Sequence, residues 1–173
     1  MTITRSTARR LGSVGAAAAL VAVGLAVPTA ATAAPTECEP GTVTNTLTKD
    51  SSERIVAGSQ TATTTTGGPL SATVASSATR GSEFSAGASA SLLMGSITAQ
   101  VSATATESQS WDAGSTLGPI EVPAGGTLTS TYGFEDISWS GTTRTCTSAG
   151  QLGAPTTVYG TVQGATWVEY TVS

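Results

Sequence analysis

This chain of 173 residues has no histidine and little charge, with seven basic and eleven acidic residues. Without histidine, no Ser-His-Asp or Cys-His arrangement for nucleophilic catalysis can form within the chain, and a histidine-ligated zinc site is excluded as well. Aromatic residues are also few, at eight. Serine and threonine are abundant instead and together account for 55 residues. The length is typical of a single domain.

The first 33 residues have the features of a secretory signal peptide. Three arginines precede the first acidic residue, Glu37, an apolar run spans 14–27, and Ala31 and Ala33 supply the small side chains of a cleavage site. The apolar run is shorter than the roughly 20 residues that a transmembrane helix needs. We therefore predict cleavage after Ala33, a secreted protein, and a single domain over 34–173.

The charge of the chain limits the classes of partner that it can bind, and its cysteine content indicates the compartment in which it folds. The predicted mature chain keeps four basic residues against all eleven acidic ones, so its net charge is 4 − 11 = −7. Such a chain cannot neutralise a row of phosphates, and we expect no nucleic-acid partner. Cys38 and Cys146, an even number in an exported chain, predict a disulfide rather than free thiols or a redox pair. The bond would close a loop of 109 residues.

Hydrophobic periodicity predicts an all-β fold. Threonine, serine, valine and glycine dominate after the signal, and apolar residues repeat with a period of two, which is typical of strands. We predict an elongated antiparallel β-sheet or sandwich of about nine to ten Ser/Thr-rich strands, separated by turns rich in glycine and proline. The expected strands are 42–49, 54–65, 70–78, 84–92, 97–110, 117–122, 127–138, 142–147, 156–161 and 166–172.

The distribution of large side chains predicts where the core lies. Seven of the eight aromatic residues lie beyond residue 110, and large side chains bury most of the area that stabilises a core. We therefore expect the core in 111–173, with help from the segment around Val43, Leu47 and Ile55. Residues 60–110 can bury little area per residue and should form a thin, extended sheet.

Residues 84–105 show the pattern of an amphipathic hairpin. Every even residue from 84 to 92 and every odd residue from 97 to 105 is apolar. With a four-residue loop at 93–96, partner numbers sum to 189, and all apolar pairs share one face; a slip of one residue would destroy this match. The apolar residues of this hairpin and its tip are Phe84, Ala86, Ala88, Ala90, Leu92, Leu93, Met94, Ile97, Ala99, Val101, Ala103 and Ala105.

Two further features of this hairpin suggest a membrane role. No charged residue occurs from Phe84 to Thr106, a run of 23, and the tip is apolar where soluble hairpins usually have polar turn residues. Nine-residue strands reach the lower limit for crossing a membrane, and backbone groups in lipid must pair, so several copies would have to close into a barrel. The alternative is a hairpin that packs one face on the domain core.

The Ser/Thr-rich flanks, the uncharged hairpin and the phrase Val122-Pro123-Ala124-Gly125-Gly126-Thr127 resemble the pore-forming module of the aerolysin-like toxins, in the epsilon-toxin and mosquitocidal-toxin branch. The resemblance covers about 42–135. It implies an aerolysin-like layout, a membrane or cell-surface receptor, and a homo-oligomer in which the released hairpin forms a transmembrane β-barrel. The chain departs from the family in leaving little room for a separate receptor-binding domain. Its bias for arginine over lysine, six to one, is similar to that of small secreted proteins of GC-rich Gram-positive bacteria.

Other functions have less support in the sequence. Glu135 and Asp136 are adjacent in an expected strand and point to opposite faces, and no acidic residues show the spacing of a calcium loop. We therefore predict no enzyme activity, cofactor or metal. The rival function is an extracellular binding or adaptor module, a subunit of a secreted toxin or a cell-wall-associated assembly, that docks a protein partner by β-augmentation. The candidate ligand or partner aromatics are Trp139, Tyr159, Trp167 and Tyr170.

Overall fold

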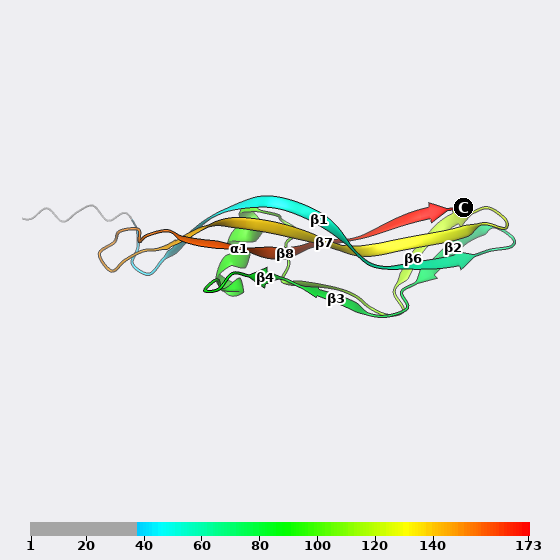
Figure 1. Ribbon diagram of the computed structural model, residues 1–173, viewed down its shortest axis with the longest axis horizontal. Coiled ribbons are helices and arrows are strands. Elements are labelled where there is room, and N and C mark those ends of the chain that lie inside the picture. The colour runs from blue at the N-terminus through cyan, green and yellow to red at the C-terminus, as the bar shows by residue number, and fades with distance from the viewer. Residues whose placement is uncertain (1–37) are drawn as a thin grey trace, which may run out of the picture. The chain divides into compact units, whose positions relative to one another are not determined.

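The computed structural model describes residues 38–173 (Figure 1). The signal peptide predicted for 1–33 lies outside the described residues. Strands make up most of the described chain, which confirms the all-β prediction. The elements are β1 (Val43–Thr63), β2 (Gly68–Thr73), β3 (Ala78–Gly81), β4 (Glu83–Phe84), α1 (Ala90–Gln100), β5 (Ser108–Trp111), β6 (Thr116–Val122), β7 (Thr127–Thr145) and β8 (Thr156–Val172).

The main sheet has the strand order β1-β7-β8-β4, and all its neighbouring strands are antiparallel. β1, β7 and β8 run side by side over most of their length (Figure 1). β1 has 21 residues, which corresponds to about 70 Å of extended chain. The sheet is therefore long and narrow.

The described residues form eight strands instead of the nine or ten predicted. β1, β7 and β8 each join two predicted strands, and β3 at Ala78–Gly81 is a strand that was not predicted separately. In β1 the charged stretch 49–54 looks like a turn in the sequence, yet the strand continues through it with a register shift between Lys49 and Ser51. A bulge absorbs the extra residue, and the solvent-facing side of an antiparallel sheet accepts charged side chains.

Two short ribbons accompany the main sheet, β2 with β6 and β3 with β5. The β2–β6 ribbon covers one face of β7 through a cluster of buried residues that consists of Ala72, Val74, Leu117 and Tyr132. The turn at Pro123 to Gly126 joins β6 to β7, and the Gly126 N–H donates a 2.9 Å hydrogen bond to the Pro123 carbonyl. The predicted glycine-rich turn at this phrase is confirmed.

A second cluster of buried residues lies between α1 and the main sheet. It consists of Leu47, Leu93, Ile97, Ala105, Ile137, Trp139, Val158 and Val162. The expectation that 60–110 contributes little to the core is wrong, since both clusters include residues of this stretch. Val43 was expected to support the core and is instead exposed.

The prediction that 84–105 forms two paired strands is also wrong for this structure. Only Glu83–Phe84 is strand, and Ala90–Gln100 is an α-helix that runs across the strands of the main sheet (Figure 1). Leu93, Ile97 and Val101 are spaced by four residues, so one helical face can bury them together. Alanine, leucine and methionine are strong helix formers, and their presence favours the helix over the alternation of a strand.

The predicted disulfide is confirmed, with a Cα–Cα distance of 5.9 Å between Cys38 and Cys146. It joins the chain just before β1 to the residue just after β7, where backbone hydrogen bonds also run from Cys146 to Thr42 and from Gly41 to Cys146. The bond therefore fastens one end of the β1–β7 pair covalently. A disulfide is compatible with an extracellular location.

Candidate functional site

The candidate site is the segment that covers one region of the main sheet. We name residues 82–107 the docked segment; it contains β4, α1 and their connections. β4 pairs with β8, Thr106 forms an isolated bridge with Gln163, and α1 packs on the sheet beside β1. The docked segment is therefore held to the sheet at its two ends and at its helix.

The first end is fixed by β4. Phe84 lies against Trp139 with 6.0 Å between the ring centroids, and the Ser85 N–H donates a 2.9 Å hydrogen bond to the Tyr159 carbonyl. Gly160 makes this close approach possible, because a Cβ at this position would overlap the Glu83 carbonyl oxygen. Glycine has no Cβ and lets the two backbones meet.

The helix is fixed by two buried side chains and a small polar network. Leu93 is 3% exposed and Ile97 is fully buried, and burial of each contributes about 1.5–3 kcal/mol. Asn45 on β1 donates a 2.9 Å hydrogen bond to the Ser96 hydroxyl. Gln100 accepts from the Leu47 N–H at 2.9 Å and donates to the Asn45 carbonyl at 3.1 Å.

An ion pair holds β3 to β7 beside the docked segment. The Arg80 guanidinium donates two hydrogen bonds to the Asp136 carboxylate, of 2.7 Å and 2.5 Å. These bonds hold the pKa of Asp136 below its ordinary value of 3.8, while partial burial opposes the shift and a hydrogen bond with Gln163 adds to it. The pKa of Arg80 is raised by the same pairing and, to a smaller extent, by the charges of Glu83 and Glu53.

Replacing Asp136 with Asn is expected to lower the free energy of unfolding at pH 7 by about 1 kcal/mol, because the Arg80 side chain is 42% exposed and its pairing is screened by solvent. The lowered pKa means that the folded chain binds fewer protons in acid than the unfolded chain does. The contribution of Asp136 is therefore complete above about pH 4 and is lost as the pH falls through the lowered pKa.

Urea unfolding of the wild type and Asp136→Asn at pH 7 and pH 3 measures this difference. The two proteins should differ at pH 7, and the difference should be smaller at pH 3. Asp112→Asn removes an exposed acid from the turn after β5 and is the matched control. A difference that is equal at both pH values would contradict the role of the charge.

Three buried polar atoms without hydrogen-bond partners belong to residues beside the docked segment. Within the described part of the chain, four buried side-chain atoms lack a hydrogen bond: Asn45 Oδ1, Ser130 Oγ, Trp139 Nε1 and Gln163 Oε1. Asn45 is hydrogen-bonded to Ser96, and Trp139 contacts Phe84. Gln163 is hydrogen-bonded to Gly81, just before the docked segment, and pairs with Thr106. A buried polar atom without a hydrogen-bond partner is unfavourable, so these three atoms weaken the docking.

The base of a hairpin is already formed next to the docked segment. β3 and β5 pair with Ala78 opposite Trp111 and Gly81 opposite Ser108. The Ser82 N–H then donates a 2.7 Å hydrogen bond to the Glu107 carbonyl, which continues the same register by one pair. Every pair of this ribbon sums to 189, the register that the alternation of 84–105 predicts.

The predicted hairpin residues do not share one face here. Leu93, Ile97 and Ala105 are buried, and four more pack against them: Phe84, Ala88, Met94 and Val101. Leu92 is 63% exposed. Ala86, Ala99 and Ala103 are also exposed, and Ala90 is half-buried.

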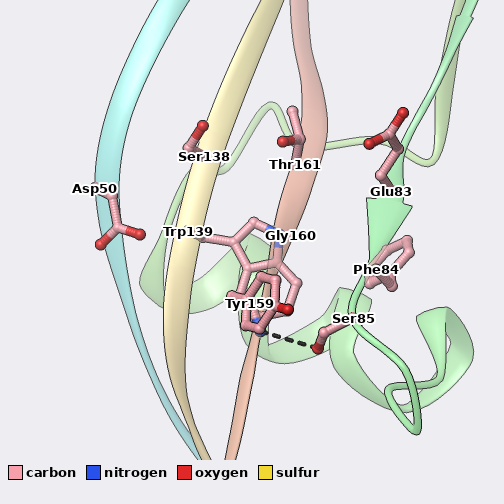
Figure 2. Close-up of a pocket in the computed structure, with 9 residues that line it drawn as sticks. All are labelled: Asp50, Glu83, Phe84, Ser85, Ser138, Trp139, Tyr159, Gly160 and Thr161. Carbon is pink, nitrogen blue, oxygen red and sulfur yellow. Dashed lines mark hydrogen bonds between the residues drawn. The ribbon is translucent and has the colours of Figure 1, made fainter.

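The four predicted ligand or partner aromatics lie at different places along the sheet. Trp139 is buried, and its neighbour Tyr159 is 60% exposed; both line a hollow of about 510 Å³ (Figure 2). Trp167 donates a hydrogen bond of 2.9 Å to the Phe134 carbonyl, and Arg54 lies 5.5 Å from the centre of its ring. Tyr170 is partly exposed farther along β8. Only Trp139 and Tyr159 line the same hollow, and their side chains lie on opposite faces of the sheet, because Trp139 is the register partner of Gly160.

Sequence reasoning missed the Arg80–Asp136 pair. It considered Asp136 only beside Glu135, where the alternation of a strand separates the two carboxylates. The sequence held one indication of the pair: basic residues are scarce, and Arg80 is one of only four beyond residue 33. A lone arginine at the base of an uncharged run was a candidate partner for an acid.

Within residues 38–173, no three acidic, cysteine or histidine side chains are grouped as they would be to hold a metal ion. No helix in this part of the chain has the length and apolar character needed to cross a membrane. Comparison of the chain with protein-family models, curated proteins and solved structures finds no match.

Proposed function

We propose that the protein permeabilises membranes through an oligomeric β-barrel, to which each copy contributes one hairpin made from the docked segment. The docked segment leaves the main sheet, α1 unfolds, and residues 82–107 pair with each other as an extension of the β3–β5 ribbon. This function is that of a secreted, non-enzymatic protein that acts on a membrane or on a cell bearing its receptor.

The observation that carries this proposal is the shared register. The β3–β5 ribbon and the Ser82–Glu107 hydrogen bond fix partner numbers that sum to 189. Extension of this register places Phe84 opposite Ala105 and Leu92 opposite Ile97, with all apolar side chains on one face. A shift of one residue in the ribbon would have placed the apolar residues of the two hairpin strands on opposite faces. Hairpin formation therefore needs no change in the pairing of β3 with β5.

The energetics of docking support the same conversion. The helix is short, at eleven residues, and helices of this length are marginal on their own in water. Three unpartnered buried polar atoms under the docked segment regain water when it leaves. The docked arrangement is held by the burial of Leu93 and Ile97, by the contact between Phe84 and Trp139, and by backbone pairing at the two ends of the segment.

Dye release from liposomes tests the proposal with two variants that the structure makes comparable. Ala99 and Thr98 are neighbours on α1 and both are exposed, so Asp at either position is tolerated by the docked fold. In the hairpin, Ala99 lies on the apolar face and Thr98 on the polar face. We expect release by wild type and Thr98→Asp, and a loss of about tenfold or more for Ala99→Asp, because a charge facing lipid is costly.

Vesicles of neutral, anionic and sterol-containing composition are used, with the oxidised protein of residues 34–173. Urea unfolding of both variants provides the control, and equal stabilities are expected. Equal loss of release in both variants, or equal activity in both, would count against an inserted hairpin with this register. Absence of release by the wild type from every vesicle would favour the alternative function.

The alternative is an extracellular binding or adaptor module, and the open edges of the main sheet favour it. Among residues 38–173, β1 pairs only with β7, and the part of β8 beyond its bridge to Thr106 also pairs only with β7. Such edges can accept a strand of a protein partner. The two functions differ in their response to a cross-link that holds the docked segment on the sheet. Such a cross-link would leave partner binding by an adaptor module unchanged and would prevent pore formation.

A further inference from the structure

The hollow in Figure 2 extends across all four strands of the main sheet. Ser138 on β7, Thr161 on β8 and Glu83 on β4 are directly opposite one another in the register, so their side chains share a face. Asp50 on β1 lies at the opposite end from Glu83 (Figure 2). Three strand spacings separate β1 from β4, which gives the hollow a length of about 14 Å.

Tyr159 stands in the middle of this hollow and is 60% exposed. It occupies the same face as Thr161, two residues along β8. Its backbone is held in place, because the Tyr159 N–H donates a 3.1 Å hydrogen bond to the Ser85 hydroxyl. The ring is therefore presented on a fixed backbone between hydroxyl groups.

The chemistry of the lining indicates a neutral, hydroxyl-rich ligand. The hollow offers one exposed aromatic ring, hydroxyls from several strands and a carboxylate near each end, and no basic residue lines it. An anionic ligand would be repelled by the two carboxylates. Their separation suits an extended ligand with several hydroxyls better than a small cation, since carboxylates accept hydrogen bonds and hydroxyls both donate and accept them.

We propose that this hollow binds a short saccharide, with a sugar ring stacked on Tyr159 and hydroxyls hydrogen-bonded to Asp50 and Glu83. Because Glu83 and Ser85 belong to the docked segment, the complete site exists only while the segment is docked. A bound saccharide therefore stabilises docking by mass action. We therefore expect slower dye release when the saccharide is present, and this expectation rests on the proposed function. Saccharide binding itself is independent of the proposed function.

Nuclear magnetic resonance titration of the ¹⁵N-labelled protein tests the binding. The probes are maltose, cellobiose, lactose and N,N′-diacetylchitobiose, with spermidine as a cationic competitor. At least one saccharide should shift the amide signals of Ser138 and Thr161 in a saturable way, with a dissociation constant in the millimolar range. Tyr159→Ala should weaken saccharide binding about tenfold through loss of the stacking surface, and Tyr159→Phe should retain the wild-type affinity.

Tyr170→Ala is the matched control, because Tyr170 is also an exposed tyrosine of β8 but lies outside the hollow. It should bind as the wild type does. The proposal is overturned if no saccharide gives saturable shifts at the hollow, if Tyr159→Ala binds unchanged, or if only spermidine binds. Saccharide binding by a protein that releases no dye would leave this site standing while the proposed function fails.

Discussion

Dye release is expected to disappear when β4 is joined to β8 by an engineered disulfide, Glu83→Cys with Thr161→Cys. These residues are register partners, and opposite residues of antiparallel strands have the Cα spacing that a disulfide requires. The bond would hold Glu83 on the sheet and prevent the extension of the β3–β5 ribbon beyond Ser82. Position 160 is unsuitable for this purpose, because it accepts no Cβ.

Reduction of the engineered bond should restore dye release. The wild type under the same reductant shows what loss of the Cys38–Cys146 bond does by itself, and each single cysteine variant shows the effect of its substitution. Persistent release by the oxidised double variant would mean that the docked segment stays on the sheet during permeabilisation. The proposed conversion would then be wrong.

Removal of the native disulfide is expected to lower the free energy of unfolding, and by more than the Asp136→Asn substitution does. The bond closes a loop of 109 residues, and the double variant Cys38→Ser with Cys146→Ser should lose about 4–5 kcal/mol of unfolding free energy through the greater entropy of the unfolded chain. Urea unfolding of this variant and of the oxidised wild type measures the difference.

Cys146 is 3% exposed, so its replacement by serine also places a hydroxyl in a buried position. Reduced wild type separates the two effects, because it loses the bond and keeps both sulfur atoms. A loss below about 1 kcal/mol in reduced wild type would show that the β1–β7 pairing alone maintains this end of the sheet.

Much of the fold follows from local pattern. The alternation of apolar residues predicts strands, the cysteine count predicts the disulfide, and the glycine-rich phrase after Val122 predicts the turn that leads into β7. The joining of predicted strands into β1, β7 and β8 does not follow, because a bulge at Asp50 leaves no mark in the sequence that differs from a turn. Charged residues serve equally well on a solvated strand face and in a loop.

The helix could not be predicted because residues 84–105 satisfy two periods at once. Leu93, Ile97 and Val101 suit a helical face, while Leu92, Ile97 and Val101 suit one face of a hairpin. Local propensity favours the helix but is too weak to decide between them, and tertiary packing on Ile137 and Trp139 determines the outcome. The pairing of Arg80 with Asp136 is likewise a product of topology, since 56 residues separate the two in the chain.

Two folding requirements on one segment also restrict which substitutions it can accept over evolution. Under the proposed conversion, each side chain from 84 to 105 has to fit a helix on a sheet at one time and a strand in lipid or water at another. Small residues such as alanine, serine and threonine meet both requirements at little cost, whereas a large or charged side chain that suits one arrangement harms the other. The plainness of this stretch, which contains no charge and few large side chains, is then the result of selection for compatibility with both structures, and relatives of this protein should vary less there than on the exposed strands that never rearrange.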